Sequence, residues 1–592
     1  MERKFLNLNK FVSVLFFLGS LSMTYSQEIL KQGKDIVNNN NLKYTRTNKE
    51  FGNVSFIKNM ENVEDVLAIE TTVRPQFIYK ASTAIPIKKM ALEKGQKVLV
   101  AFKGKTVFSG LETGEARFLW VLNQTGDYKG NISSTISLSK EWKQYYIPFE
   151  ITQDVKKEKL RMAIQFGYQP QKALFSDIEI LVFDKTVPLE KLPKTKIKYV
   201  GMEEDAAWRK KALANIESIR KGTFNLRFEK NGVPLKNKQI EIKQIKHEFS
   251  WGATINAADI LNDKNQLKYL SRDFNEVVFA NDLKIKSWHR EKNRARTLAA
   301  MEAIGETDLK LKGHVLIWPG FQYQNKETRT MENNPEELTK LIRDHVVNIT
   351  ETTKGKVSHW DVVNEAYTNK DFQRITGSEE ILYDGFRILK ELQPTVGRFT
   401  NEYGIISKGG IDFEKQQWYY EYIKRIDKNT GGLVDGIGIQ CHIGSDLTPP
   451  EKVISILNYY GTLKKKISIS EFTMEIKDDE VREKYTADFI IAAFSQPNVS
   501  EFLFWGFHAE GNPKAILYHK DWTYSPMGKA YHDLVLDRWQ TELKEKTNKE
   551  GQLSVNGFYG TYEYRYKEKG KIKKGVFYLK KSGAKELKIE LK

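Results

Sequence analysis

The stretch that decides the fold is HWDVVNEA, residues 359–366, in which a short apolar run ends in Asn364 and Glu365. Apolar runs of this length between polar residues are typical of strands buried on both faces. In parallel β-architectures, functional side chains stand at the carboxyl ends of such strands. Residues 359–366 therefore predict a buried strand whose last residues face a site.

Seven further segments have the same character, and they are FSWGATIN (249–256), FNEVVFAN (274–281), KGHVLIWP (312–319), VGRFTNEY (396–403), VDGIGIQCH (434–442), KKISISEF (465–472) and EFLFWGFH (501–508). Amphipathic segments such as PEELTKLIRDHVVNITETT lie between most of them. Strand and helix thus alternate eight times. This alternation predicts an α/β fold with a (β/α)8 TIM barrel.

The barrel is one of several expected parts. Strand patterns such as KVLVAF, ARFLWVLN and SDIEILVF predict a β-sandwich over residues 45–190. A strand-paired lead-in precedes the barrel strands within residues 204–540, and residues 541–592 predict a small lysine-rich β appendage. Residues 1–26 have the basic start, apolar run and short polar exit of a signal peptide. We therefore expect a secreted or periplasmic protein without a membrane span.

Composition excludes several classes of protein. The 592 residues include 40% hydrophobic and 12% aromatic residues, which fits a globular chain rather than a disordered one. The single cysteine, Cys441, rules out an intramolecular disulfide and a multi-thiolate metal site. The net charge of +18 admits nucleic acid as a partner, but the lysines alternate with Asp and Glu as on a solvated surface. We expect no nucleic-acid partner.

Two carboxylates, Glu365 and Glu471, follow predicted barrel strands four and seven. Three strand and helix units separate them, which places them on nearly opposite sides of the barrel mouth. Glycoside hydrolysis requires a facing pair of carboxyl groups, one to protonate the leaving oxygen and one to attack or to hold water. The alternative for each is an ordinary surface glutamate. Other polar or aromatic residues at strand ends are Asn281, Lys284, His314, Trp318, Asn364, Gln440, His442, Trp505 and His508.

Five motifs together resemble the strand-end motifs of glycoside hydrolase family 10, the endo-β-1,4-xylanases. They are HWDVVNEA (359–366), KGHVLIW (312–318), GIGIQCH (436–442), ISISEF (467–472) and FWGFH (504–508). The resemblance covers residues 250–540. It implies an endo-acting, retaining hydrolase of β-1,4-xylosidic bonds in a polysaccharide that works by double displacement. We also expect this secreted protein to need no cofactor or metal and to act as a monomer.

The resemblance also implies roles for residues. Glu365 corresponds to the acid/base, Glu471 to the nucleophile, and Asn364 to the residue that binds the 2-hydroxyl of the attacked sugar. Side chains that correspond to those orienting the nucleophile or the sugar are His314, Gln440 and His442. Side chains that correspond to the floor and walls of the sugar site are Asn281, Lys284, Trp318 and Trp505.

The family pattern is not complete in this chain. Pro319 and Phe321 stand where many members have His and Gln, and Thr473 stands where many have Asp. Ala280 replaces a Glu, and a second lid aromatic after Trp505 is missing. Because of these differences, the sequence does not define the shape of the glycone side, the part of the site that binds the sugars on the non-leaving side of the cleaved bond. Alternatives are a retaining hydrolase of another β-glycan, such as mixed-linkage xylan, mannan or β-glucan, and a catalytically weak polysaccharide-binding protein.

The N-terminal β-domain resembles the jelly-roll carbohydrate-binding modules that precede such enzymes, mainly through IQFGYQ (164–169) and FSDIEILVF (175–183). Aromatic rings bind sugars by stacking on their apolar faces. The available aromatics are Trp120, Tyr128, Trp142, Tyr145 and Tyr168. In a sandwich strand such residues are also common in the core, so sugar binding and core packing are both open at this point.

Overall fold

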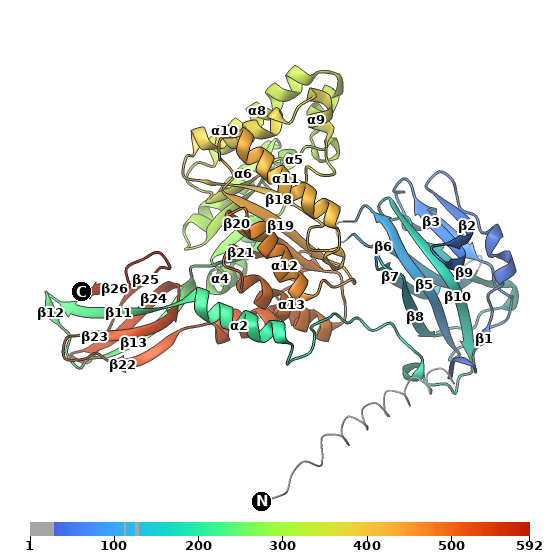
Figure 1. Cartoon of the computed structure of the whole chain (residues 1–592), viewed down its shortest axis with the longest axis horizontal. Helices are drawn as coiled ribbons and strands as arrows, with labels where there is room; N and C mark the ends of the chain where they lie inside the picture. The colour runs from blue at the N-terminus through green and yellow to red at the C-terminus, as the bar shows by residue number, and fades with distance from the viewer. Residues whose placement is uncertain (1–28, 112–113, 125–129, 592) are drawn as a thin grey trace, which may run out of the picture. The chain divides into compact units, whose positions relative to one another are not determined.

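The computed structural model of the chain describes residues 29–111, 114–124 and 130–591 (Figure 1). The predicted signal peptide at residues 1–26 lies outside this range, as does Tyr128. The chain divides into two compact units, residues up to 197 with 444–446, and residues 198–443 with 447–592.

The first unit contains two antiparallel sheets. One has the order β2-β3-β10-β5-β8 with β1 beside β10, and the other has the order β4-β9-β6-β7. The strands are β1 (Lys34–Asp35), β2 (Gly52–Met60), β3 (Val63–Thr71), β4 (Ser82–Ile85), β5 (Lys97–Ser109), β6 (Ala116–Gln124), β7 (Gly130–Leu138), β8 (Lys143–Glu150), β9 (Leu160–Gln165) and β10 (Gln171–Phe183). The predicted β-rich N-terminal region is therefore present.

Aromatic residues form the centre of this sandwich. The ring of Phe102 lies 5.1 Å from that of Trp120 and 5.3 Å from that of Tyr145. Trp120 is 1% and Tyr145 5% exposed, so both are core residues that no sugar can reach. Among the described residues of this domain, the large aromatic side chains that are exposed are Phe77, Tyr79 and Phe108.

The second unit contains a closed barrel of eight parallel strands, in which β14 pairs with both β15 and β21. The strands are β14 (Ser250–Ile255), β15 (Glu276–Phe279), β16 (Lys310–Ile317), β17 (His359–Asn364), β18 (Gly397–Glu402), β19 (Gly436–Ile443), β20 (Lys466–Met474) and β21 (Val499–Phe504). Each lies within one of the eight predicted segments or overlaps it. The predicted (β/α)8 fold is confirmed.

Helices surround the barrel (Figure 1). They are α2 (Ala207–Arg220), α3 (Ala257–Asn262), α4 (Lys264–Asp273), α5 (Ile285–Trp288), α6 (Glu291–Gly305), α7 (Lys326–Arg329), α8 (Pro335–Thr352), α9 (Asp371–Thr376), α10 (Glu380–Leu392), α11 (Phe413–Asn429), α12 (Pro450–Gly461), α13 (Asp479–Phe494) and α14 (Pro526–Tyr531), which continues as a π-helix, η8 (His532–Arg538).

Helix α8 illustrates how the sequence sets these elements. The Asn334 side chain caps the first turn by accepting from the Glu337 amide, and Pro335 occupies the first turn, where its missing N–H costs nothing. Residues on one face are buried, among them Leu338, Ile342, Val346 and Ile349. The helix therefore packs an apolar stripe against the barrel.

The lead-in and the C-terminal tail form one β-structure. One sheet has the order β12-β11-β23 with β26 beside β11, and the other has the order β22-β13-β24-β25. The strands are β11 (Lys221–Lys230), β12 (Val233–Pro234), β13 (Gln239–His247), β22 (Glu542–Lys546), β23 (Gln552–Phe558), β24 (Gly560–Glu568), β25 (Lys571–Leu579) and β26 (Glu586–Glu590). The sequence predicts two separate parts here; the structure instead pairs them because their apolar faces bury each other in one core.

Across the described part of the chain, the helices are either too short or too polar to span a bilayer.

Candidate active site

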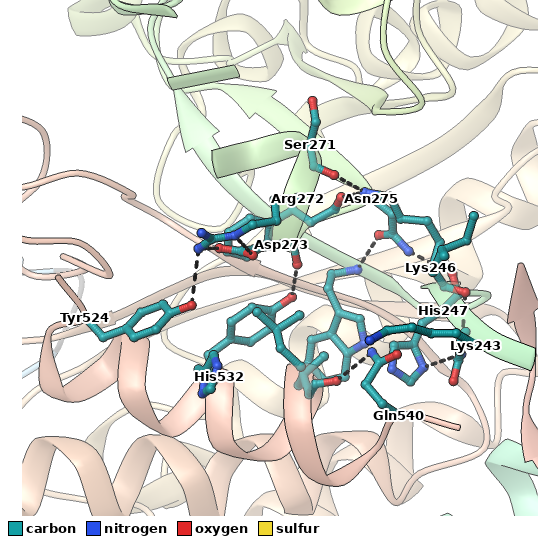
Figure 2. Close-up of a pocket in the computed structure, with 17 residues that line it drawn as sticks. Lys243, Lys246, His247, Ser271, Arg272, Asp273, Asn275, Tyr524, His532 and Gln540 are labelled. Carbon is teal, nitrogen blue, oxygen red and sulfur yellow. Dashed lines mark hydrogen bonds and ion pairs between the residues drawn. The ribbon is translucent and has the colours of Figure 1, made fainter. Parts of the chain in front are cut away.

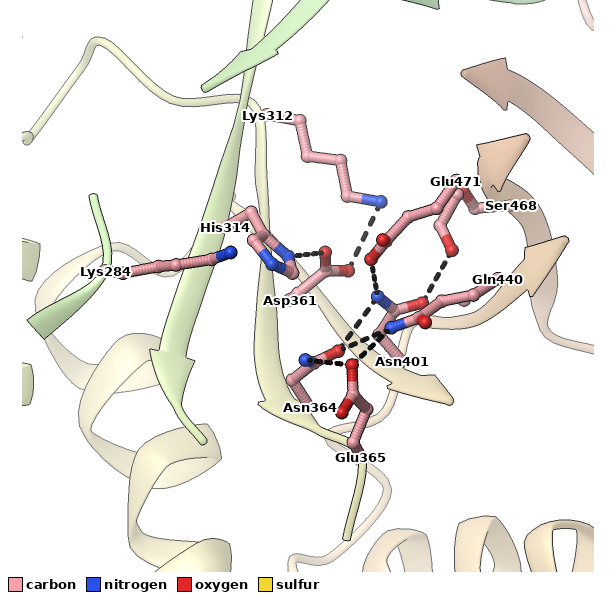
Figure 3. A network of polar contacts seen from close by, with 12 residues as sticks. Lys284, Lys312, His314, Asp361, Asn364, Glu365, Asn401, Gln440, Ser468 and Glu471 are labelled. Carbon is pink, nitrogen blue, oxygen red and sulfur yellow. Dashed lines mark hydrogen bonds and ion pairs between the residues drawn. The ribbon is translucent and has the colours of Figure 1, made fainter. Parts of the chain in front are cut away.

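The carboxyl ends of the barrel strands bring the predicted residues together in one polar cluster. Figure 3 shows Glu365 and Glu471 on opposite sides of a group of amide side chains, with His314 and Lys284 on the same face of the barrel. Both glutamates are only 4% exposed. The cluster is therefore a largely desolvated site at the end of the barrel where enzymes of this fold carry their catalytic groups.

Glu365 comes directly after β17 and has a left-handed backbone with φ of 55°. A residue with a Cβ adopts this conformation at a cost of about 1–3 kcal/mol, and such residues concentrate at functional sites. The amide of Glu365 donates to the carbonyl of Asn401 on the next strand, at 2.9 Å. The strand end is thus held in a bend that sets the direction of the carboxylate.

Glu471 lies within β20, and two side chains contact its carboxylate. Its Oε1 accepts from Asn401 Nδ2 at 2.8 Å, and its Oε2 lies 3.2 Å from His442 Nε2. The other ring nitrogen of His442 lies 3.0 Å from the Thr473 hydroxyl oxygen. With the Thr473 hydroxyl donating to Nδ1, the proton of the ring is on Nε2, which donates to Glu471.

Amide side chains join the two carboxylates. Asn401 Nδ2 donates to Asn364 Oδ1 at 3.0 Å, and Gln440 Nε2 donates both to Asn364 Oδ1 and to Glu365 Oε1, each at 3.1 Å. Asn364 Nδ2 then donates to Glu365 Oε1 at 3.1 Å. The donors and acceptors fit in only one orientation of each amide, so the network fixes how the carboxylates face each other.

Asn401 is a central member that the sequence analysis did not select. Its Oδ1 accepts from the Ser470 hydroxyl at 2.6 Å. It also occupies space that only a glycine leaves open, since a Cβ at Gly438 would lie 2.4 Å from Asn401 Oδ1. The available signal was its place at the end of predicted strand five, in the same position as the polar ends of the other strands.

Predicted sugar-binding residues lie beside the pair. Lys284 Nζ donates to Asn281 Oδ1 at 3.0 Å and lies 4.9 Å from the centre of the Trp318 ring. Trp318 stacks on Tyr323 with ring centres 3.5 Å apart. The Lys284 ammonium and the Asn281 amide are thus held close to one aromatic surface, an arrangement that suits a ligand with both hydroxyl groups and an apolar face.

His314 and Trp505 form another pair, with ring centres 5.1 Å apart in an edge-to-face contact. His314 Nδ1 lies 2.9 Å from Asp361 Oδ2, and both side chains are buried. Asp361 lies in the middle of β17, where no positional signal in the sequence marks it. An ionised Asp361 accepts from Nδ1–H and so leaves Nε2 of His314 as an acceptor for a ligand.

A buried ion cluster continues from Asp361 into the barrel. Lys312 Nζ lies 3.2 Å from both Asp361 Oδ1 and Glu501 Oε1, and Glu501 Oε2 lies 2.8 Å from His359 Nε2. Burial alone would raise the pKa of Asp361, but Lys312 and His314 bring that pKa below its usual value. Burial likewise opposes the charge of Lys312, yet Asp361 and Glu501 outweigh burial and raise its pKa.

The same cluster contains one group of side chains with metal-ligand spacing. The ligand atoms of Glu276, His359 and Glu501 lie within 4.8 Å of one another. However, the Lys312 ammonium already lies 3.2 Å from Glu501 and supplies the positive charge that a cation would bring. These residues therefore form an ion-pair network rather than a site that favours a metal ion.

We expect Lys312→Met to destabilise the protein by about 3–5 kcal/mol, because it leaves buried Asp361 and Glu501 without their cation. The pKa of both carboxyl groups then rises in the folded state of the variant. In the unfolded state these groups have pKa values of about 4, so between pH 7 and 5 only the folded state takes up protons. The difference in stability from the wild type should therefore shrink as the pH falls from 7 towards 5. Thermal or urea unfolding at several pH values measures this difference.

The matched control is Lys466→Met, which removes an exposed lysine at the start of β20. It should change stability by no more than about 0.5 kcal/mol. A destabilisation of Lys312→Met that stays constant between pH 7 and 5 would count against the charge-pairing explanation.

A separate cavity of about 590 Å³ lies near the amino ends of the barrel strands, beside Trp251 and Asn275 (Figure 2). Its charged groups are already paired. Arg272 binds Asp273 at 2.6 Å, and Lys246 donates to the carbonyls at the end of α4. This end of a barrel serves stability rather than catalysis, and we assign the cavity no role in the site.

Comparison with known proteins shows which family the barrel region resembles. Residues 242–515 match the sequence profile "Glycosyl hydrolase family 10". The chain is 26% identical over 378 residues to Anti-sigma-I factor RsgI6 of Acetivibrio thermocellus, which covers 62% of this chain and 47% of that protein. It is 24% identical over 328 residues to Endo-1,4-beta-xylanase 3 of Arabidopsis thaliana, covering 55% of this chain and 42% of that protein.

The chain thus spans less than half the length of these two relatives. Among solved structures, native xylanase 10B from Thermotoga maritima is similar with a TM-score of 0.44 and 24% identity, over 49% of this chain and 96% of that one.

Proposed function

We propose that this chain, whose residues 242–515 belong to glycosyl hydrolase family 10, is an endo-acting retaining glycoside hydrolase that cleaves β-1,4-xylosidic bonds. The observation that carries the proposal is the pair of buried carboxylates, Glu365 and Glu471, joined by Asn364, Asn401 and Gln440. Because two carboxyl groups flank one small space, one can serve as proton donor and the other as nucleophile.

In the first step, Glu471 attacks the anomeric carbon while neutral Glu365 donates its proton to the glycosidic oxygen. The two donors on Glu471, Asn401 and His442, hold its carboxylate in one direction before the attack. The carboxyl groups of retaining enzymes lie about 5–5.5 Å apart, close enough for this covalent step.

In the second step, water hydrolyses the glycosyl ester. Esterification removes the charge of Glu471, so Glu365 has released its proton and now acts as the base that activates the water. Asn364 presents its amide to the same space, and we assign it to the 2-hydroxyl of the attacked sugar. Retention of configuration follows because two inversions occur at one carbon.

Hydrolysis assays on a panel of polysaccharides identify the substrate. Purified protein should release oligosaccharides of several lengths from glucuronoxylan or arabinoxylan, and NMR of the earliest products should show the β anomer. Early accumulation of the α anomer would refute the retaining assignment. Release from mannan or β-glucan alone would refute the xylan assignment and favour the alternative of another β-glycan.

Further parts of the proposal concern the whole chain. The sequence of residues 1–26 supports export, and we propose that the protein acts as a monomer without cofactor, metal or nucleic acid. We also propose that the N-terminal β-domain binds glycan. The exposed rings of Phe77 and Tyr79 support this, since their centres lie 5.5 Å apart with an interplanar angle of 9°.

A further inference from the structure

One histidine ring at the barrel mouth is buried without a hydrogen bond to any residue that the structure describes. His508 is 8% exposed, and within the described part of the chain neither of its ring nitrogens has a hydrogen-bond partner. Buried polar side chains nearly always have partners, so an exception of this kind calls for an explanation. The ring is also held firmly, because it stacks on Trp522 with centres 4.5 Å apart.

His508 lines a cavity of about 440 Å³ at the carboxyl ends of β14, β15 and β21. The cavity shares Asn281 and Trp505 with the candidate active site. Its volume lies within the range of about 300–1,000 Å³ of small-molecule pockets. Ala280 also lines it, and the short side chain of this residue keeps that wall open.

The position of the cavity identifies the part of the substrate that can enter it. The leaving group must lie beside the acid, Glu365, at the end of β17. Around the closed barrel, β21 lies four strands and β14 three strands from β17, so both strand ends stand across the barrel mouth from Glu365, and β15 lies two strands from β17. The cavity therefore faces the non-leaving, glycone part of the glycan.

The charges around the cavity restrict the ligand further. Among the described residues that line it, the charged ones are Asp259 and Glu510, both acidic. The nearest cation, Lys284, lies behind Asn281 and donates to its side chain. A uronic acid would meet repulsion from both carboxylates, whereas a neutral sugar would not. A neutral imidazole offers one donor and one acceptor, which two neighbouring hydroxyl groups of a sugar satisfy.

We propose that His508 is a specificity-determining residue that binds the hydroxyl groups of a neutral glycone sugar in this cavity, and that Asp259 and Glu510 exclude acidic sugars from it. The inference rests on the proposed function, since it assigns one subsite of that glycan cleft. Its ligand class is an uncharged pyranose of a β-linked chain. It explains why a polar ring is buried with both nitrogens unused.

The test is His508→Phe, which keeps a ring to stack on Trp522 and deletes both nitrogens. Two substrates with the same nitrophenyl leaving group are compared, a β-xyloside with one sugar and a β-xylobioside with two. We expect kcat/KM on the xylobioside to fall about tenfold or more, while kcat/KM on the xyloside stays within about twofold. Equal losses on both substrates, or no loss on either, would overturn the role of His508.

The control is His519→Phe, an exposed histidine of the same loop region, which should leave both rates unchanged. A wild-type protein that hydrolyses neither substrate would count against the proposed function rather than against His508 alone. Calorimetry with xylotetraose in a Glu471→Ala background gives a second readout that does not need turnover. There, His508→Phe should weaken binding about tenfold, and unchanged affinity would overturn the proposal.

A separate experiment tests whether Asp259 and Glu510 exclude acidic sugars. Glu510→Gln should raise kcat/KM on a xylo-oligosaccharide with a glucuronic acid on the glycone side, relative to the linear oligosaccharide of equal length. We expect a several-fold change in this ratio, and more when Asp259→Asn is added. An unchanged ratio in the double variant would show that these carboxylates do not exclude acidic sugars.

Discussion

Glu471→Ala is expected to lower kcat on xylan by a factor on the order of 10⁴ or more, because the variant has no group that can form the covalent intermediate. The fold should persist, since Asn401 keeps its hydrogen bonds with Asn364 and Ser470, and His442 keeps its contact with Thr473. Reducing-sugar release measures the rate, and thermal unfolding checks the fold. Glu391→Ala, at an exposed position near the end of α10, is the matched control and should retain full activity.

The companion variant Glu365→Ala separates the two roles. An acid/base is needed to protonate a poor leaving group such as a sugar, but not an activated nitrophenolate. The loss should therefore be large on xylan and much smaller for the first step on a nitrophenyl xylobioside, whereas Glu471→Ala should lose both. The opposite pattern of losses would mean that Glu365 is the nucleophile and Glu471 the acid/base.

Removal of residues 541–592 is expected to prevent the second unit from folding to a soluble, active state. The tail supplies nine of the 14 buried residues of the core that it shares with β11 and β13. Each large apolar side chain contributes about 1.5–3 kcal/mol when buried, so the loss exceeds the usual stability of a domain of about 5–15 kcal/mol. Recovery of a soluble truncated protein with wild-type melting behaviour would refute this.

Point variants on β25 test the same core without deletion. Phe577 is 6% exposed and Tyr578 is 58% exposed, although they are neighbours on one strand. Phe577→Ala should cost about 3–5 kcal/mol of unfolding free energy, and Tyr578→Ala less than about 0.5 kcal/mol. Similar losses for both variants would mean that β25 contributes through its backbone pairing rather than through the buried side chain.

The barrel and the place of its two candidate glutamates could be predicted because the signal for them is local. Each barrel strand is an apolar run with a polar end, and the fold rule places those ends together. Glu365 and Glu471 needed no long-range information beyond their order in the chain. The confirmed barrel places both of them in one buried cluster with Asn364, Gln440 and His442.

Residues whose role depends on spatial neighbours could not be predicted in the same way. Asp361 lies in mid-strand, and only its contacts with His314 and Lys312 show its importance. Asn401 had a positional signal, yet its function comes from its place between Asn364 and Glu471. The pairing of β11 with β23 joins segments more than 300 residues apart, which no local pattern of residues can indicate.

That distant pairing also affects how the protein is made. Strands β11 and β13 are synthesised about 300 residues or more before β22 to β26, their partners in both sheets. At roughly 5–20 residues per second, the ribosome needs about 15–65 s to cover that distance. During this interval the apolar faces that carry Phe224 and Ile242 lack the tail side chains that cover them, and they are open to misassociation. A cell that produces this protein must therefore protect those strands until the last part of the chain emerges.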